Sequence, residues 1–151
     1  MPDPASPHSL GQINIVVRDM QKSLAFYRLL GLVVKEIPLP EWAPHHANGT
    51  TANGVHVALD SVAYAKQWNP GFDESRLGSA TTAFFHVAAR EDVDAIYARI
   101  VEAGYQSQSA PEDAFWGARY AIVSDPDGNA VGIMSAIDPA KRRRPPPPPA
   151  A

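Results

Sequence analysis

The sequence contains no cysteine and no long apolar run, and each absence excludes a class of protein. Without cysteine there can be no disulfide, no thiolate-bound zinc and no cysteine nucleophile, which suits a cytoplasmic protein. No apolar run approaches the roughly 20 residues that span a bilayer. The polar, Pro-rich residues 1–9 also lack the apolar stretch of a secretory signal, and we expect them to be disordered. We therefore expect a cytoplasmic protein with no membrane association.

Basic charge is concentrated near the end of the chain. The formal net charge is −3, but Lys141 to Arg144 are all basic, so the preceding part has 9 basic and 16 acidic residues, a net charge of −7. An acidic body argues against nucleic-acid binding, which needs a basic face. The basic run leads into Pro145 to Pro149, which favour an extended polyproline II conformation. We predict that residues 138–151 form a disordered tail, with recruitment of a partner as the alternative.

Common catalytic signatures are also missing. No Gly-x-Ser-x-Gly elbow, phosphate loop or dinucleotide fingerprint is present, which argues against serine hydrolysis and nucleotide cofactors. A general acid or base that works without a metal would have to come from one of five residues, which are Asp60, His56, Glu112, Asp113 and Tyr120.

The first half of the chain predicts a β-α-β-β order with a second, short helix. Asp19 is a typical N-cap and Gly31 a typical C-cap for a helix between them. Residues 38–54, rich in Pro, Asn and Gly, predict a loop with one short strand near Trp42 or Thr50. The flanking strands and the second helix are predicted at 10–17, 32–37, 55–59 and 61–68.

The second half repeats this order. A strand is predicted at 81–87 and a helix at 91–103 that ends at Gly104. The spacing from Asp92 to Gly104 equals that from Asp19 to Gly31, 12 residues, which gives an internal repeat of about 73 residues.

The repeat closes with a predicted β-hairpin. Two short apolar runs, 119–123 and 130–134, flank the sequence Asp125-Pro126-Asp127-Gly128-Asn129. Proline, glycine and side chains that bond nearby backbone make this a strong turn signal.

These elements predict an α+β fold of two tandem βαβββ modules, at about residues 10–68 and 80–136, within one domain at 10–137. Two such half-sheets would form a curved, mixed and mostly antiparallel sheet with helices outside and a concave pocket within.

The motifs resemble those of the vicinal oxygen chelate superfamily, which groups glyoxalase I, the extradiol dioxygenases and the bleomycin-resistance proteins. The matching segments keep the family's order and spacing: 12–19, 23–27, 30–32, 93–95, 103–104 and 125–129. The resemblance covers roughly residues 10–136 and implies a glyoxalase-like fold and a homodimer. It does not fix the function, because this fold hosts many chemistries.

Enzymes of this superfamily place His, Gln or Glu at four inner-strand positions around a divalent metal. The corresponding positions of this chain are Gln12, Ala58, Thr82 and Gly132. Only Gln12 keeps a ligand side chain, so the resemblance implies a protein without metal or other cofactor. The alternative is a divalent metal at a shifted site made by Gln12, His56 and Asp60.

The remaining histidines are expected to be structural. His45 and His46 fall in the Pro- and Asn-rich loop and are expected to be exposed to solvent. His86 alternates with apolar residues, so we expect it to face the helix side or a polar neighbour.

Aromatic and polar side chains are the predicted ligand-binding residues: Trp42, His56, Asp60, Phe84, Phe115, Trp116, Arg119 and Tyr120. We expect about half of the rings in these segments to be core, with Phe85 first among them. Residues 115–120 resemble the Trp-Gly-x-Arg element of bleomycin-resistance-type proteins, which bind cationic or planar antibiotics, usually at a dimer interface.

Two functions follow. The preferred one is metal-free binding or sequestration of a small aromatic or cationic molecule by a homodimer. The alternative is an enzyme of the glyoxalase, lyase or dioxygenase type with an atypical metal site or none.

Overall fold

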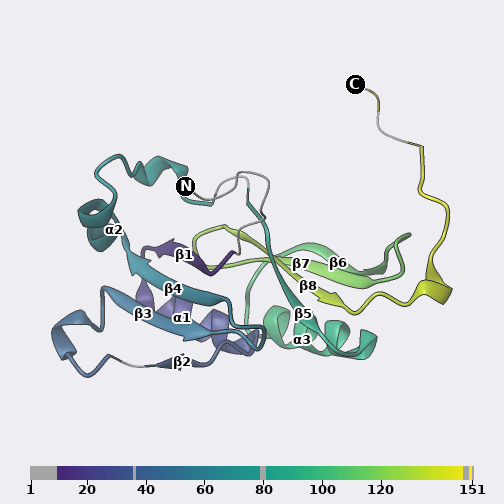
Figure 1. Ribbon diagram of the computed structural model, residues 1–151, viewed down its shortest axis with the longest axis horizontal. Coiled ribbons are helices and arrows are strands. Elements are labelled where there is room, and N and C mark those ends of the chain that lie inside the picture. The colour runs from purple at the N-terminus through teal and green to yellow at the C-terminus, as the bar shows by residue number, and fades with distance from the viewer. Residues whose placement is uncertain (1–9, 36, 79–80, 148–149, 151) are drawn as a thin grey trace, which may run out of the picture. The chain divides into compact units, whose positions relative to one another are not determined.

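The computed structural model describes residues 10–35, 37–78, 81–147 and 150, and the chain forms two compact units (Figure 1). Unit 1 comprises residues 1–74 and unit 2 residues 75–151. Each unit contains one four-stranded mixed sheet, which confirms the predicted α+β class and the two tandem modules. Of the helices in these described ranges, none has the length and apolar character of a membrane span.

Unit 1 has the strand order β1-β4-β3-β2, in which β1 and β4 are parallel and the other pairs antiparallel. Helix α1 begins after Asp19, whose carboxylate accepts a hydrogen bond from the backbone nitrogen of Lys22 at 3.0 Å, as predicted for an N-cap. The elements are β1 (Gln12–Val17), α1 (Met20–Leu29), β2 (Val34–Lys35), a 3-10 turn (Pro40–Trp42), β3 (His46–Thr50), β4 (His56–Ser61) and α2 (Val62–Trp68).

Unit 2 repeats this topology with the order β5-β8-β7-β6, and β5 is parallel to β8. The repeat of strand order confirms the internal duplication inferred from the sequence. The elements are β5 (Ala83–Val87), α3 (Arg90–Glu102), β6 (Ser107–Asp113), β7 (Arg119–Ser124), β8 (Ala130–Ser135) and a 3-10 turn (Pro139–Lys141); a further 3-10 turn, Glu74–Arg76, lies where the units join in sequence.

The predicted turn between β7 and β8 is organised by Asp125. Its buried carboxylate accepts hydrogen bonds from the backbone nitrogens of Asp127 and Asn129, at 2.9 and 2.8 Å. Gly128 has a φ of +85°, which side-chain-bearing residues rarely adopt. The turn chemistry read from the sequence therefore sets the register of the hairpin.

Alternation along the strands separates the face that packs against α1 or α3 from the opposite face of each sheet, which we call the free face. In unit 1, Val17, Val57 and Leu59 are buried, and α1 packs against β4. In unit 2, Val123 and Ile133 are buried with the apolar residues of α3. On each strand, the residues that alternate with these point to the opposite face of the sheet. The candidate sites lie on that face.

His86 is one of these free-face residues. It pairs with Met134 across the sheet, lies two residues from Phe84 and is exposed. The prediction that it faces the helix side is wrong, because the alternation of β5 assigns that side to Phe85 and Val87, and the alternative of a polar neighbour stays a prediction.

The sequence predicted β3 only as one short strand near Trp42 or Thr50, of which the second position is right, and it gave no bounds for β6. β3 has the sequence His-Ala-Asn-Gly-Thr and β6 Ser-Gln-Ser-Ala-Pro-Glu-Asp, both poor in β-branched and aromatic residues. Pairing with neighbouring strands imposes the extended form. At Gly49 the chains approach so closely that a Cβ would lie 2.3 Å from the carbonyl oxygen of Val33.

Candidate functional site

Five polar side chains form a continuous hydrogen-bonded network on the free face of unit 1. They come from three adjacent strands, whose register brings His46 opposite Asp60 and Gln12 opposite His56. Gln12 donates to Asn14 at 2.6 Å, and Asn14 donates to Asp60 at 2.7 Å. The other two members are His46 and Asn48 on β3, whose side-chain nitrogens lie 3.2 Å apart.

Asp60 is the centre of this network. Its side chain is fully buried, with Oδ1 2.6 Å from Nδ1 of His46 and Oδ2 accepting from Asn14. A buried carboxylate is costly without such donors. Because an ionised carboxylate only accepts, Nδ1 of His46 carries the proton, which leaves Nε2 to accept from Asn48. Asp60 and Asn48 therefore hold the imidazole of His46 in one orientation.

A cavity of about 450 Å³ lies over this network, within the usual size range of small-molecule sites. Polar side chains form one wall and rings from α2 the other: Gln12, Asn14, His46, Asp60, Tyr64 and Trp68. Tyr64 also contacts the rings of Trp42 and His46, with centroids 5.0 and 5.7 Å apart. The cavity thus combines hydrogen-bonding groups with flat apolar surface.

The divalent metal of the superfamily's enzymes does not fit the side chains at the four corresponding positions. Ala58 is buried and has no donor atom. At Gly132 a Cβ would lie 2.2 Å from the ring of Phe84, so this ring occupies the space that a ligand side chain would need. Thr82, the third position, immediately precedes β5 and carries only a hydroxyl.

A shifted metal site finds no better support. His56 is not part of the cavity wall that contains Gln12 and Asp60. Within the described residues, no three His, Cys, Asp or Glu side chains are grouped closely enough to hold a metal ion.

Four rings form an aromatic surface on unit 2, which comprises Phe84, Phe115, Trp116 and Tyr120. Trp116 stacks on Tyr120 at a centroid distance of 5.4 Å and meets Phe115 edge-on at 5.1 Å. The ring centroids of Phe84 and Tyr120 are 6.5 Å apart. Phe84 and Phe115 remain 42% and 37% exposed, which is unusual for such large apolar side chains. This surface is therefore not closed by unit 2 itself.

An acidic group borders the aromatic surface. Glu112 accepts a hydrogen bond from the hydroxyl of Tyr120. This bond, together with burial, raises the pKa of Tyr120 above its ordinary value. The hydroxyl of Tyr120 is thus a hydrogen-bond donor to Glu112, which places a carboxylate beside the ring.

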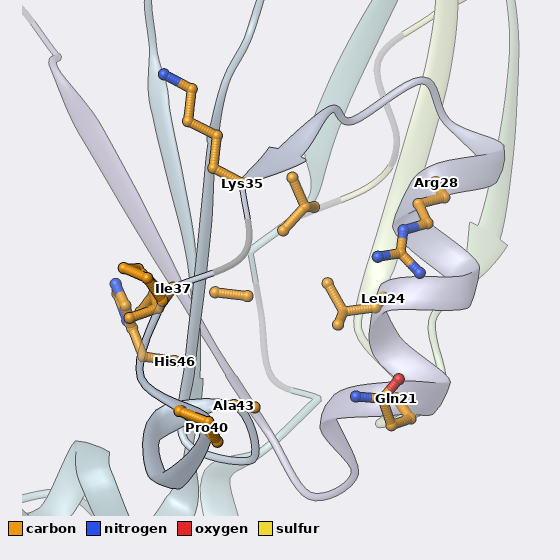
Figure 2. Close-up of a pocket in the computed structure, with 11 residues that line it drawn as sticks. Gln21, Leu24, Arg28, Lys35, Ile37, Pro40, Ala43 and His46 are labelled. Atoms are coloured by element: carbon orange, nitrogen blue, oxygen red, sulfur yellow. The ribbon is translucent and has the colours of Figure 1, made fainter.

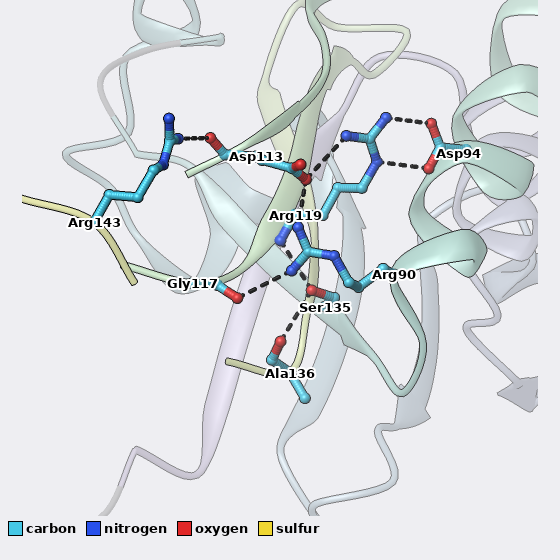
Figure 3. Close-up of polar contacts among 8 residues, drawn as sticks. All are labelled: Arg90, Asp94, Asp113, Gly117, Arg119, Ser135, Ala136 and Arg143. Carbon is cyan, nitrogen blue, oxygen red and sulfur yellow. Dashed lines mark hydrogen bonds and ion pairs between the residues drawn. The ribbon is translucent and has the colours of Figure 1, made fainter. Parts of the chain in front are cut away.

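Arg119 precedes Tyr120 on β7, so strand alternation directs the two side chains to opposite faces, and Figure 3 shows the guanidinium of Arg119 directed toward Asp94 of α3. Its guanidinium forms two 2.7 Å hydrogen bonds with Asp94 of α3 and a third, of 3.1 Å, with Asp113. These bonds lower the pKa of both carboxyls, against the effect of desolvation, and raise that of Arg119. Arg90 also bonds Asp113. Arg119 therefore joins α3 to β7, away from the predicted ligand-binding rings.

Hydrogen bonds from the segment after β8 stabilise the turn that contains Phe115 and Trp116. Gly117 accepts a hydrogen bond from the backbone nitrogen of Asp138 at 3.0 Å, and Phe115 accepts one from Arg143 at 2.8 Å. The guanidinium of Arg143 also bonds the carbonyl of Asp113 at 2.7 Å (Figure 3). We call residues 138–143 the C-terminal clasp. These contacts favour a start of the predicted disordered tail after Arg143.

The predicted ligand-binding residues fall into separate groups. Phe84, Phe115, Trp116 and Tyr120 form the aromatic surface of unit 2, and Asp60 and Trp42 belong to the polar site of unit 1 or its aromatic border. His56 and Arg119 join neither group.

Sequence reasoning missed several members of the unit 1 site, His46 above all. The expectation that His45 and His46 are exposed loop residues is wrong for His46, whereas His45 lies in a turn, as expected, but is only partly exposed. His46 lies on β3 with a side chain only 21% exposed, and Nδ1 of His45 lies 2.9 Å from Oγ of Ser61. Asn14 could have been found from the sequence, because it lies two residues after Gln12 on β1 and so on the same face. Tyr64 and Trp68 lie on α2, and only the structure shows that this side of α2 borders the cavity.

Known proteins resemble this chain in sequence. The family model for the Glyoxalase/Bleomycin resistance protein/Dioxygenase superfamily matches residues 9–133. Uncharacterized proteins from Mycobacterium bovis and Mycobacterium tuberculosis are 31% identical over 126 residues, which is 82% of this chain and 77% and 69% of theirs.

Solved structures resemble the fold at lower identity. A glyoxalase-related enzyme from Fulvimarina pelagi has a TM-score of 0.72 at 21% identity, over 86% of this chain and 89% of that one. A glyoxalase/dioxygenase from Nostoc punctiforme has a TM-score of 0.67 at 23% identity, over 91% and 97% of the two chains. The extent of the family match, together with this shared fold, shows that the chain belongs to the Glyoxalase/Bleomycin resistance protein/Dioxygenase superfamily.

Proposed function

We propose that this protein binds a small, planar and cationic molecule on its aromatic surface, without a metal ion. The observation that carries the proposal is the ring of Phe84 lying over Gly132. At the position where metal-dependent relatives carry a ligand, this chain has an exposed ring. Glycine at position 132 therefore has two effects: no ligand side chain is present, and the ring of Phe84 adds apolar surface that a small molecule can contact.

The chemistry of the aromatic surface favours a cation. Flat rings attract cations through their negative faces, by about 0.5–2 kcal/mol for each contact. Glu112 adds a carboxylate beside Tyr120, and the net charge of −7 before the basic run attracts cations at longer range. An apolar surface of this kind commonly marks a binding site in a soluble protein.

A second candidate function is proton transfer without a metal, supported by the pairing of Asp60 with His46. The ring of His46 lines a cavity of about 450 Å³, and its Nε2 could accept a proton from a bound molecule that displaces the side chain of Asn48. The alternative function, an enzyme, is thus proposed here as a metal-free catalyst of proton transfer. For the whole protein we further propose a cytoplasmic homodimer, on its composition and the family resemblance.

Calorimetric titration with proflavine, a planar cation, tests the binding proposal. Trp116→Ala should weaken binding by about tenfold while changing the melting temperature little, since Trp116 supplies stacking surface. Trp68→Ala, which removes a 45% exposed ring from unit 1, is the matched control.

The outcomes separate the alternatives. Loss of binding only in Trp68→Ala would move the site to unit 1 and contradict the proposal, as would equal binding of an anionic planar dye such as 1-anthracenesulfonate. A stoichiometric divalent ion in protein purified without chelator would contradict the metal-free part of the proposal.

A further inference from the structure

Unit 1 contains a second hollow, which lies between α1 and the chain from β2 to the start of β3 (Figure 2). Its volume is about 420 Å³, enough for a small organic molecule. We call it the α1 groove. All of its lining residues belong to unit 1, and the proposed function assigns it no role.

The floor and one wall of the α1 groove are apolar. Leu24 and Ala47 are buried beneath it, and Val34 and Ile37 are partly exposed along its length. Pro38 and Pro40, which also line it, are rigid residues with little side-chain entropy to lose when a ligand binds. A ligand could therefore bury an apolar body here without extensive ordering of the groove.

The opposite wall presents polar groups from one stripe of α1. Gln21, Leu24 and Arg28 are three and four residues apart, so they lie on the same side of the helix. Figure 2 shows the guanidinium of Arg28 and the amide of Gln21 directed from α1 into the groove. Lys35 borders the groove with its stem, and its ammonium points away from α1.

The charge of this lining contrasts with that of the chain. Among its described residues are two cations, Arg28 and Lys35, and no carboxylate, although the net charge of the protein is negative. Arg90 and Arg119 each bond an aspartate, whereas the guanidinium of Arg28 has no ion pair or hydrogen bond with any residue that the structure describes. A planar guanidinium next to apolar surface is suited to bidentate binding of a carboxylate.

We propose that the α1 groove binds a small amphiphilic carboxylate, with its carboxylate on Arg28 and its apolar body along Leu24, Val34 and Ile37. The groove is too small for a macromolecular segment with a large buried face, and its lining favours an anion over a cation. The two ligand classes of this protein thus differ in charge: a cation at the aromatic surface and an anion in the α1 groove.

The probe for this proposal is decanoate, measured by isothermal titration calorimetry with the full chain below the micelle concentration. Arg28→Gln should weaken decanoate binding by about tenfold or more, as expected for a lost charged hydrogen bond. Arg28→Lys should recover only part of the affinity, because an ammonium cannot bind a carboxylate in the same bidentate way. Arg99→Gln makes the same charge change at an exposed position of α3 and is the matched control.

A second variant tests the groove without changing charge. Ala43 is exposed and lines the groove, so Ala43→Trp should fill it and abolish binding while the protein stays folded. Absence of decanoate binding to the wild type, equal binding of decyltrimethylammonium, or binding unaffected by both Arg28→Gln and Ala43→Trp would each overturn the proposal. Proflavine binding should be unchanged in both variants, which separates this result from the proposed function.

Discussion

One added methyl group at Gly132 is expected to test the arrangement of the β8 strand and the Phe84 ring. The Cβ of Gly132→Ala would lie 2.2, 2.3 and 2.7 Å from three ring atoms of Phe84, all closer than carbon atoms can approach. The ring must therefore move. Overpacking of this kind costs about 1–3 kcal/mol, and the partial exposure of Phe84 favours the lower half of that range.

A double-mutant cycle isolates this contact. In a Phe84→Ala background the clash is absent, and replacing a strand glycine by alanine should then stabilise the protein by about 0.5–1 kcal/mol. The two substitutions should thus show a coupling energy of at least about 1.5 kcal/mol, measured by urea unfolding followed by circular dichroism. Additivity within about 0.5 kcal/mol would refute the inference that the ring of Phe84 covers Gly132.

The same cycle bears on binding. If the displaced ring of Phe84 leaves Tyr120 and Trp116 in place, Gly132→Ala should weaken proflavine binding less than Trp116→Ala does, since only one ring of the aromatic surface moves. Equal losses would mean that the whole surface depends on Phe84.

Three further predictions concern polar groups. Asp60→Asn directs an amide hydrogen at one of the two donors, His46 or Asn14, and should lower the free energy of unfolding by about 1–3 kcal/mol in urea titrations; an unchanged midpoint would show that the network is not structurally important. Arg119→Met removes the largest cause of the lowered pKa values of Asp94 and Asp113, although Arg90 still lowers that of Asp113. Carboxyls with depressed folded-state pKa values stabilise above their unfolded pKa of about 4, and this contribution disappears as pH falls through the folded values. The stability gap between wild type and Arg119→Met should therefore be largest above about pH 5 and shrink in acid, and a gap independent of pH would contradict the role of these ion pairs. Glu112→Gln should lower the pKa of Tyr120 toward its ordinary value, which ultraviolet titration of tyrosinate can follow; no change would show that Glu112 does not control this hydroxyl.

Local chemistry made much of the fold predictable. Asp19 and Gly31 bracket α1, and the carboxylate of Asp125 makes the hairpin turn largely by itself, so short sequence segments contain the information. The repeat of these signals along the chain then predicted two modules of like topology, which the strand orders confirm.

The unit 1 site was less predictable because its members meet only through strand pairing. His46 and Asp60 are 14 residues apart, and His46 becomes a partner only because β3, whose residues have low strand propensity, pairs with β4 in one register. The rings of Phe115, Trp116 and Tyr120 were easier to find, since they lie within six residues and the turn at Gly117 keeps them together.

The C-terminal clasp sets a practical limit on how the protein can be shortened. A truncation that removes the basic and Pro-rich end at residue 137 would also delete Asp138 and Arg143, and with them the bonds to the backbone of Gly117, Phe115 and Asp113. The loop that displays Trp116 would then lose its support. A shortened protein without the polyproline segment should therefore end after Arg144. A C-terminal affinity tag should follow Arg144, so that the contacts of the C-terminal clasp with the loop are kept.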